Sequence, residues 1–315
     1  MKPFLEAVFE NATARSRARY WLISDLQQGR PELAERYLNI AMDDFRSLNI
    51  KIDGVCYLGD AAEGVNLRDL KVMTDMQTAL LDSLQVPIYY SIGNHELDYY
   101  RYARERGIKP YIPFYEWVKN KPNWHMIPDQ ESFWFYHETD DFVFLFFSDH
   151  ASKDGSWCAT HQRMPRENEL PFYPHKKSAW IAVRDRFANC GKPVFTFSHC
   201  AFPGGNRPSE YLAQMLPLPL NFRAHFHGHS HIGDANWGGK DVYRQIACID
   251  DAPVMQFDIS SLDHLRGTTV RSAIFDYFGD DEFGVFFRDH IGHKWENSCI
   301  QTQDAKTAGI RNHFF

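Results

Sequence analysis

Carboxylate, amide and imidazole side chains recur in this sequence directly after short apolar runs. These positions are Asp25, Asp60, Asn94, His95, His199, His229 and His231. Such groups are ligands for divalent metals of intermediate hardness, such as Mn, Fe or Zn. There are enough of them for two ions, and a two-metal pair clamps the attacking and leaving oxygens of an in-line displacement at phosphorus. The sequence therefore predicts a two-metal site suited to phosphoryl chemistry.

A single polar residue after a strand would not carry this prediction. An Asp or Asn at such a place is usually a turn residue or a helix cap. A turn does not require His199, His229 and His231 as well. The ordered set therefore favours ligation.

The elements that must position these residues alternate in type. Apolar runs predict strands at Tyr20 to Ile23, Gly54 to Leu58 and Pro87 to Ile92. Apolar residues at helical spacing lie between them: Ala34, Tyr37, Leu38, Ala41, Met42 and Phe45, then Leu70, Met73, Leu80 and Leu84. This order implies a parallel sheet, in which the loops after the strand carboxyl ends carry the site.

The rest of the chain predicts a second set of strands. Residues 97–130 are dense in Tyr, Trp and Pro and suggest an inserted loop or cap. A strand pair is expected at 133–137 and 142–147, a helix at 175–189, and strands at 194–198 and 223–227. A short helix is expected at 210–216, and strands at 243–249, 254–259, 269–278 and 283–288, followed by a peripheral end. Neither a repeat nor a linker is evident, so residues 1–315 are expected to form one domain with a mainly β carboxyl-terminal part.

Composition narrows the class of protein. A net charge of -7 without a basic run argues against a dedicated nucleic-acid binder. The six cysteines form no CxxC pair, so free thiols in a reducing compartment are expected. Neither a signal peptide nor a membrane span is expected from the apolar runs. These features predict a cytoplasmic protein, and they leave its oligomeric state open.

The ordered motifs resemble the signature of the calcineurin-like metallophosphoesterase family. They are Asp25-x-Gln27, Gly59-Asp60, Gly93-Asn94-His95-Glu96, His199 and Gly228-His229-x-His231. The resemblance covers residues 20–231, in the expected order. It implies an α/β (α+β) fold of the metallo-dependent phosphatase type, a four-layered sandwich of two mixed β-sheets flanked by helices.

The resemblance also implies a role for each position. Asp60 would bridge two divalent ions, with Asp25 and His231 on the first ion and Asn94, His199 and His229 on the second. His95 would contact the substrate phosphate and assist the leaving group, and Glu96 would orient His95. A metal-bound hydroxide would be the nucleophile.

One motif departs from the family pattern. The family usually has Asp-x-His where this chain has Asp25-Leu26-Gln27. An amide oxygen is a weaker ligand than imidazole, so the first site is expected to be looser and to prefer Mn over Zn, or Gln27 lies outside the ligand set. The manganese-dependent ADP-ribose/CDP-alcohol diphosphatases resemble this chain in having Asp-x-Gln there. That likeness is a lead toward a nucleotide diphosphate compound as substrate.

Substrate contacts are harder to read. His150, Gly204-Gly205 and the aromatic insert could meet substrate, although a solvated loop, a plain turn and a self-packed cap are equally ordinary uses. The same holds for Arg101, Arg104 and Arg106. Cys200 is expected to point away from the neighbouring ligand, because strand side chains alternate.

Three functions fit these residues. The favoured one is a phosphodiesterase or pyrophosphohydrolase acting on a phosphorylated small molecule. A phosphomonoesterase would use the same ligands, and a non-catalytic scaffold would explain the weakened first motif. Retention of His95 beside every other ligand weighs against the scaffold.

Overall fold

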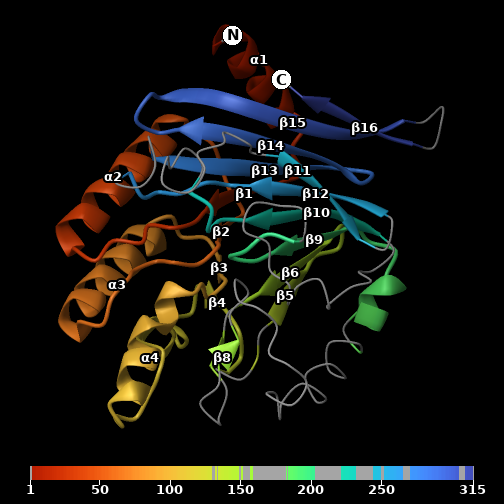
Figure 1. Cartoon of the computed structure of the whole chain (residues 1–315). Coiled ribbons are helices and arrows are strands. Elements are labelled where there is room, and N and C mark those ends of the chain that lie inside the picture. Colours follow the sequence, from red (N-terminus) through yellow and green to blue (C-terminus); the bar gives the residue numbers. More distant parts are fainter. Residues whose placement is uncertain are drawn as a thin grey trace.

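The computed structural model describes residues 2–129, 132, 134–148, 150–151, 157–158, 182, 184–202, 221–231, 244–249, 252–264, 270–304 and 309–314. Figure 1 shows two β-sheets packed together, with helices along the outer side of the larger sheet. Both sheets are mixed. The expected α/β architecture of two mixed sheets flanked by helices is confirmed.

The amino-terminal part alternates strands and helices as expected. After α1 (Lys2–Thr13) come β1 (Ala18–Ile23), α2 (Pro31–Ser47), β2 (Gly54–Tyr57), α3 (Leu67–Asp82) and β3 (Ile88–Tyr90). Strands β1, β2 and β3 are mutually parallel. Their carboxyl ends therefore meet at one edge of the sheet, and the loops that follow them lie side by side.

Helix α2 buries the face that its apolar spacing predicts. All six apolar positions named above are buried, and Asp44 is buried among them. Pro31 begins the helix, where a missing N–H costs nothing. Trp21 of β1 stacks on Phe45, with ring centroids 4.4 Å apart, so this face fastens the helix to the sheet.

Helix α3 turns a slightly different face inward from the one predicted. Leu70 and Met73 are buried as expected, but Leu81 is the fully buried leucine, and Leu80 is only partly buried. Polar Gln77 shares the inner face because its amide is satisfied: it accepts from Tyr57 Oη at 2.8 Å and donates to the Ala61 carbonyl at 2.9 Å. Apolar spacing alone missed this face because a hydrogen-bonded glutamine can stand in a core position.

Residues 97–130, which suggested a cap or insert, join the larger sheet. They carry the end of the 3₁₀ helix η1 (His95–Leu97), then α4 (Asp98–Glu105), α5 (Pro113–Val118) and β4 (Trp124–His125). Strand β4 pairs with β3 in parallel. Phe114 stacks on Tyr90 at 4.5 Å between centroids, so several aromatic residues of this segment pack into the main core.

The remaining strands complete both sheets, except β7 and β8, which pair with each other in a separate two-stranded sheet. They are β5 (Trp134–Glu138), β6 (Val143–Phe147), β7 (His150–Ala151), β8 (Trp157–Cys158), β9 (Val194–Phe197), β10 (Phe222–His227), β11 (Arg244–Ile249), β12 (Ala252–Asp258), β13 (Arg271–Gly279), β14 (Glu282–Asp289), β15 (Lys294–Asp304) and β16 (Gly309–Phe314). The larger sheet has the order β16-β15-β14-β13-β1-β2-β3-β4, and the smaller has the order β11-β12-β10-β9-β6-β5. The chain end expected to be peripheral forms the edge strand β16.

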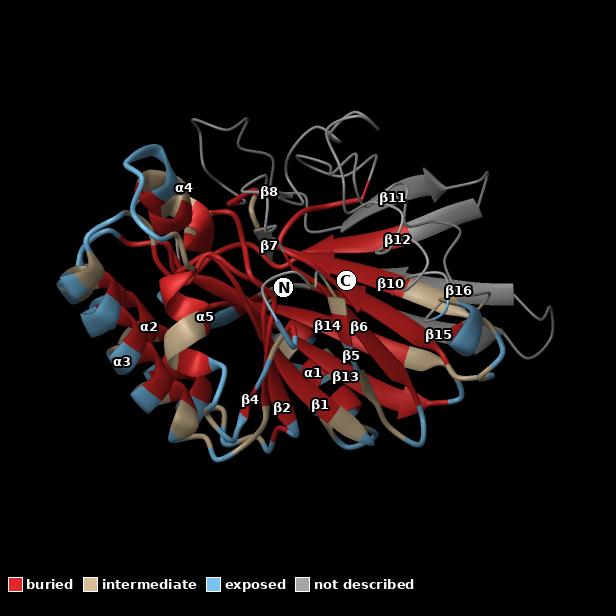
Figure 2. Ribbon diagram, turned by 90° about the horizontal axis from the view of Figure 1, so that it is seen from below, coloured by how far each residue is buried: buried red, intermediate tan, exposed pale blue. Residues whose placement is uncertain are grey.

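Aromatic rings fill the space between the sheets. Phe144 of β6 meets Tyr20 of β1 edge-on at 4.8 Å, and Phe195 of β9 meets Phe275 of β13 at 4.9 Å. Edge-to-face pairs of this kind add to the area that aromatic side chains bury. Figure 2 shows the strands buried and the outer faces of α2 and α3 exposed. Residues 184–188 are helical, and Phe187 packs on Tyr136 of β5, which belongs to the smaller sheet.

Two expected helices lie wholly or partly outside the described residues. These are 210–216, which is entirely outside, and 175–189, of which 182 and 184–189 are described. Within the described part, no helix has the length and apolarity that a membrane crossing requires.

Candidate metal centre

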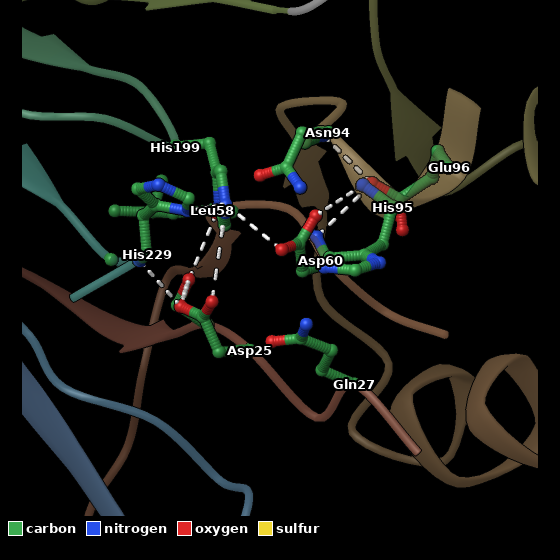
Figure 3. A network of polar contacts seen from close by, with 12 residues as sticks. Asp25, Gln27, Leu58, Asp60, Asn94, His95, Glu96, His199 and His229 are labelled. Carbon is green, nitrogen blue, oxygen red and sulfur yellow. Dashed lines mark hydrogen bonds and ion pairs between the residues drawn. The ribbon is translucent and has the colours of Figure 1, made fainter. Parts of the chain in front are cut away.

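Loops from both sheets meet at the carboxyl ends of their parallel strands. The larger sheet contributes Asp25 after β1, Asp60 after β2 and Asn94 after β3, and the smaller sheet contributes His199 after β9 and His229 after β10. Cross-connections hold the loops together. The Asp25 amide donates to the Gly59 carbonyl at 3.1 Å, and the His229 amide donates to Asp25 Oδ2 at 2.9 Å. Figure 3 shows these side chains turned toward one another.

The backbone at these strand ends is left-handed. Positive φ angles occur at Asp25 (53°), Gln27 (35°), Asp60 (52°), His229 (64°) and His231 (46°). Such conformations are uncommon outside glycine and cost about 1–3 kcal/mol each, so they persist only where the surroundings enforce them. Because several of these conformations occur at the predicted ligands, the surrounding fold must enforce the positions of these residues, as is common at functional sites.

Two glycines of the motifs allow the loops to approach closely. A Cβ at Gly228 would collide with Ser24 Oγ and Asp25 Oδ2, and one at Gly93 would collide with Asp60 Oδ1. Neither position can therefore carry a side chain without moving a predicted ligand. The glycines of the GNHE and GHSH tetrapeptides thus have a steric role beside the histidines.

Asp60 lies at the centre of the cluster and is fully buried. Its Oδ1 accepts the His95 amide at 2.8 Å, and its Oδ2 lies 2.9 Å from His199 Nε2. Asp60 is therefore a carboxylate placed between two loops, as a bridging ligand must be.

The tautomer of His199 makes its contact with Asp60 informative. Nδ1 of His199 lies 2.9 Å from the Leu58 carbonyl, which can only accept, so Nδ1 carries the proton. In the neutral ring, Nε2 then presents a lone pair toward Asp60 Oδ2, which accepts no hydrogen bond among the described residues. His229 Nδ1 lies 3.0 Å from the same Nε2. The lone pairs of His199 Nε2 and Asp60 Oδ2, which face one another in this buried site, would be stabilised by a cation between them.

Asp25 forms the second half of the cluster with His231. Its Oδ1 is buried, accepts no hydrogen bond among the described residues, and lies 3.2 Å from His231 Nε2 and 3.9 Å from His199 Nε2. Its Oδ2 is already occupied by Ser24 Oγ and the His229 amide. One oxygen thus anchors the side chain while the other faces the imidazoles.

Gln27 and Asn94 each bury an amide oxygen that lacks a donor among the described residues. Gln27 Nε2 donates to Glu63 at 3.4 Å, which leaves Oε1 as the acceptor. The backbone N–H of Gln27 also donates to the backbone carbonyl of Asp60 at 2.9 Å, so Gln27 is held beside Asp60, the predicted bridging ligand. Buried acceptors are rarely left unpaired, and a bound cation would satisfy both.

The residues present therefore fit a pair of divalent cations. Ligand atoms of Asp25, Asp60 and His199 lie within 4.8 Å of one another, as do those of His199, Cys200 and His229. The donors are carboxylate, imidazole and amide oxygen, the set that suits Mn, Fe or Zn. The acceptors on Asp25, Gln27, Asp60 and Asn94 that have no hydrogen-bond donor among the described residues are the observation that supports this fit.

Glu96 holds the motif loops rather than the histidine beside it. Its carboxylate accepts the amides of Gly93 at 2.7 Å, Asp60 at 3.0 Å and Ala61 at 2.7 Å. Burial, and then the charge of Asp60, raise the pKa of Glu96 to about 7. The resemblance suggested that Glu96 orients His95, and the hydrogen bonds of Glu96 tie the loop after β2 to the loop after β3.

His95 is partly accessible, with 27% of its side chain exposed. Burial lowers its pKa, but the carboxylates of Asp60, Asp98 and Glu63 outweigh that effect and raise the pKa to about 9. The side chain that contacts His95 Nδ1, at 2.9 Å, is Asp98. Sequence reasoning missed Asp98, although its position three residues after His95 in a helical turn is a usable signal.

The structure describes only some of the other residues that the sequence suggested as substrate contacts. Arg101 donates to Asp98 and to the Asn94 carbonyl, and Arg106 lies over the Tyr102 ring at 3.9 Å, so both have partners within the protein. Residues 204–205 and the side chain of His150 lie outside the described residues. Cys200 was expected to point away from the ligands, but its sulfur lies near the His199 and His229 nitrogens. Strand alternation does not apply there, because β9 ends at Phe197.

The aromatic segment also lines a separate cavity of about 920 Å³. Tyr115, Trp124 and Trp134 are among its walls, and none of the predicted metal ligands is. Trp124 of β4 belongs to one edge of the larger sheet and Trp134 of β5 to one edge of the smaller, so the cavity lies between those edges. The aromatic residues that line this cavity therefore do not lie at the predicted metal ligands.

Comparison with known proteins gives a family and a fold. The family model for calcineurin-like phosphoesterases matches residues 18–233. A dimetal phosphatase from Danio rerio is 14% identical, with a TM-score of 0.57 over 87% of this chain and 97% of that one. A purple acid phosphatase from yellow lupin (Lupinus luteus) seeds is 12% identical, with a TM-score of 0.49 over 89% of this chain and 53% of that one. No curated protein matches the sequence.

Proposed function

The chain belongs to the calcineurin-like phosphoesterase family, and on that premise we propose that it hydrolyses a phosphodiester or a pyrophosphate linkage in a small molecule. Membership makes it a metal-dependent phosphoester hydrolase. The proposal adds the kind of bond, the residues and the metals.

The placement of Asp60 carries the proposal. Its two oxygens face different loops, His95 on one side and His199 on the other, inside a cluster of buried acceptors. A carboxylate so placed can bridge two cations, with Asp25, Gln27 and His231 beside one and Asn94, His199 and His229 beside the other. The Oε1 of Gln27 has no donor within the part of the chain that the structure describes, which supports its inclusion among the ligands.

Two divalent cations, when bound, lower the pKa of a coordinated water toward neutrality and stabilise charge on the phosphoryl oxygens. The chain's own residues do the rest. Asp25 and Asp60 supply the negative charge that retains the cations. Glu96 keeps the loops after β2 and β3 at a fixed separation. His95 is the accessible acid–base group beside them, and it would contact the phosphate and donate a proton to the leaving oxygen.

The preference for a diester or an anhydride rests on the first motif. Gln27 stands where the family usually has histidine, as it does in the manganese-dependent ADP-ribose/CDP-alcohol diphosphatases that this motif resembles. A nucleotide diphosphate compound is therefore the substrate class we propose. A neutral amide ligand also favours Mn at the first site, because carboxylate and carbonyl oxygens suit Mn. Free thiols at Cys56, Cys190, Cys200 and Cys299 support a reducing compartment such as the cytoplasm.

The first experiment is hydrolysis of bis-p-nitrophenyl phosphate against p-nitrophenyl phosphate, after chelation and re-addition of Mn²⁺. Turnover that Mn²⁺ restores, and that Asp60→Asn abolishes, is the expected result. Preference for the monoester would overturn the diester proposal and favour a phosphomonoesterase. Metal binding without turnover of either ester would require nucleotide diphosphate compounds as the next substrates. Failure to bind metal would favour a non-catalytic scaffold.

A further inference from the structure

Cys200 lies at the edge of the metal cluster, beside two of its histidines. One ligand atom each of His199, Cys200 and His229 lies within 4.8 Å of the other two, and the side chain of Cys200 is fully buried. Two donors on one zinc ion, with sulfur at about 2.3 Å and nitrogen at about 2.1 Å from it, lie at most about 4.4 Å apart. The spacing is therefore close to that of three atoms around one cation.

Two neighbouring parallel strands, β9 and β10, bring this group together. Cys200 follows the end of β9, His229 follows the end of β10, and the Gly228 amide donates to the His199 carbonyl at 3.1 Å. The backbone carbonyl of Cys200 accepts a hydrogen bond from Ser198 Oγ at 2.5 Å. The loop that carries the sulfur is thus tied both to itself and to the loop that carries His229.

His225 of β10 gives this loop a further attachment. Its Nε2 lies 3.1 Å from the Cys200 carbonyl, and its Nδ1 lies 2.9 Å from Thr196 Oγ1 of β9. Its ring stacks on Phe202, with centroids 4.0 Å apart. The backbone is therefore held on both sides of Cys200, and this fixes the place from which the sulfur reaches the cluster.

A buried thiol often serves only as a small apolar side chain. The surroundings of Cys200 are different, because buried oxygens face the same site. Oδ2 of Asp60, 2.9 Å from His199 Nε2, and Oδ1 of Asn94 have no hydrogen-bond donor among the described residues, and both residues are at most 6% exposed. Figure 3 shows the Asn94 side chain turned toward His199 and Asp60. These oxygens point to a cation beside the sulfur, which apolar packing would not explain.

The two halves of the cluster offer different donor atoms. The group of Asp25, Asp60 and His199 contributes two carboxylates and one imidazole, whereas the group of His199, Cys200 and His229 contributes two imidazoles and a sulfur. Carboxylate and carbonyl oxygens suit Mn, and sulfur and imidazole ligands suit Zn. The sulfur therefore makes one half of the cluster softer than the other.

We propose that Cys200 binds the second cation, the one beside Asn94, His199 and His229, through its sulfur. This ligand makes the second site selective for Zn²⁺, while the first site, which is rich in oxygen, takes Mn²⁺. The centre is thus a mixed-metal one. The inference rests on the metal centre of the proposed function, to which it adds a ligand and a choice of metal, and it requires no particular substrate.

Cobalt tests the sulfur ligand directly. A cysteine sulfur bound to Co²⁺ gives a near-ultraviolet charge-transfer band that nitrogen and oxygen ligands do not give. The whole chain, stripped with chelator and titrated with Co²⁺, should develop this band, and Cys200→Ser should lack it. Cys190→Ser is the matched control and should keep the band, because the Cys190 sulfur lies at the Phe187 carbonyl, 3.1 Å away.

The outcomes separate this inference from the proposed function. Equal bands in all three proteins, or Co²⁺ bound by the wild type without a band, would overturn the sulfur ligand alone. A wild-type chain that bound no Co²⁺ would overturn the metal centre and this inference with it. A band that only Cys200→Ser loses, in a protein that hydrolyses no ester, would support the ligand and count against the hydrolysis.

X-ray absorption at the zinc edge needs no substitution. Wild type loaded with one equivalent of Zn²⁺ should show one sulfur at about 2.3 Å among nitrogen and oxygen neighbours. Nitrogen and oxygen neighbours alone would overturn the proposal even if Cys200→Ser failed to fold.

The choice of metal is tested by competition between Zn²⁺ and Mn²⁺. Cys200→Ser should weaken Zn²⁺ binding at the second site by more than the roughly 10- to 100-fold that losing an outer partner of a ligand costs. Mn²⁺ binding should change less, because the serine oxygen suits Mn. The preference for Zn²⁺ should therefore fall in Cys200→Ser and stay at the wild-type value in Cys190→Ser. An unchanged preference in Cys200→Ser would refute the role of the sulfur in selecting the metal.

Discussion

Asp60 and Asp44 are both buried carboxylates with histidines nearby, but the two carboxylates differ in the hydrogen bonds that they accept. Asp44 of α2 receives Arg288 through two hydrogen bonds of 2.8 Å, His290 at 2.8 Å and His293 at 2.6 Å. Asp60 Oδ2 faces His199 Nε2 at 2.9 Å without accepting a hydrogen bond among the described residues.

The histidine tautomers explain this difference. At Asp44, Trp21 Nε1–H donates to Ser272 Oγ at 2.7 Å, and the hydroxyl can then donate to His290 Nε2 at 2.7 Å. Nδ1–H of His290 is thereby directed at the carboxylate. At Asp60, the Leu58 carbonyl takes Nδ1–H of His199 and turns the lone pair of Nε2 inward. In the Asp44 cluster, Arg288 of the chain supplies the positive charge, so the cluster is structural. In the Asp60 cluster, acceptors face one another, so a cation from outside the chain is needed.

Asp60→Asn should give the largest effect on function. Loss of the bridging charge should lower turnover by more than the roughly 100-fold that removing an outer partner of a metal ligand costs. The unfolding free energy of the metal-free protein should not fall, because the substitution removes a negative charge from a group of buried acceptors that face one another. Activity assays and denaturant unfolding in chelator test this. A marked loss of metal-free stability would show that Asp60 resembles Asp44 after all.

Asp44→Asn should have the opposite profile. Removing one partner of a buried ion pair costs about 3–5 kcal/mol of unfolding free energy, since Arg288 is left without its counter-charge. Metal content and turnover per folded molecule should stay near wild type, because the hydrogen bonds of Asp44 among the described residues go to Arg288, His290 and His293 and not to the motif loops. Denaturant unfolding and metal analysis measure both quantities. Reduced metal content in the folded variant would contradict the separation of the two clusters.

Metal removal should separate the clusters further. Cations bind only the folded cluster, so at a free concentration about 100-fold above Kd they add about 2.7 kcal/mol to stability. Wild type and Asp44→Asn should show the same increment on Mn²⁺ addition, and Asp60→Asn should show a much smaller one. Melting temperature against free Mn²⁺ concentration is the measurement. An equal shift in Asp60→Asn would mean that the stabilising ions bind elsewhere.

Acid should destabilise the folded protein by protonating Asp44. Burial alone would raise its pKa, but the hydrogen bonds of Arg288, His290 and His293 outweigh it and hold the pKa well below its usual range. The unfolded chain therefore takes up the proton first, so this stabilisation is complete above a pH of about 4 and is lost as the pH falls below it. Unfolding midpoints at decreasing pH should fall less steeply in Asp44→Asn than in wild type. Equal slopes would show that the ion pair does not contribute.

Gln27 should give the smallest effect. If its unpaired Oε1 is a ligand, Gln27→Leu should weaken metal binding at the first site by roughly 10-fold, at the low end of such losses. Gln27→His should strengthen it, because imidazole is the better donor. Titration with Mn²⁺ and Zn²⁺ gives both affinities. Unchanged affinity in both variants would place Gln27 outside the ligand set.

Much of the fold could be read from apolar spacing. The inner face of α2 and the order of β1, β2 and β3 follow from period and length alone, because burial of apolar area drives both. The inner face of α3 could not be read fully, since Gln77 is buried by virtue of two hydrogen bonds to distant residues. The pairing of β4 with β3 was equally hidden, because a strand spanning only Trp124–His125 leaves no periodic signal.

The amino-acid sequence specifies the chemical identity of the site: which strand ends carry carboxylate, amide and imidazole, and in which order. Tertiary structure alone decided how each group is used. Glu96 accepts hydrogen bonds from the amides of Asp60 and Gly93, and the carboxylate in contact with His95 Nδ1 is that of Asp98. The physical reason is that a donor set is a property of residue types, whereas a tautomer, an unpaired acceptor or a hydrogen bond depends on distances between segments that are remote in the chain.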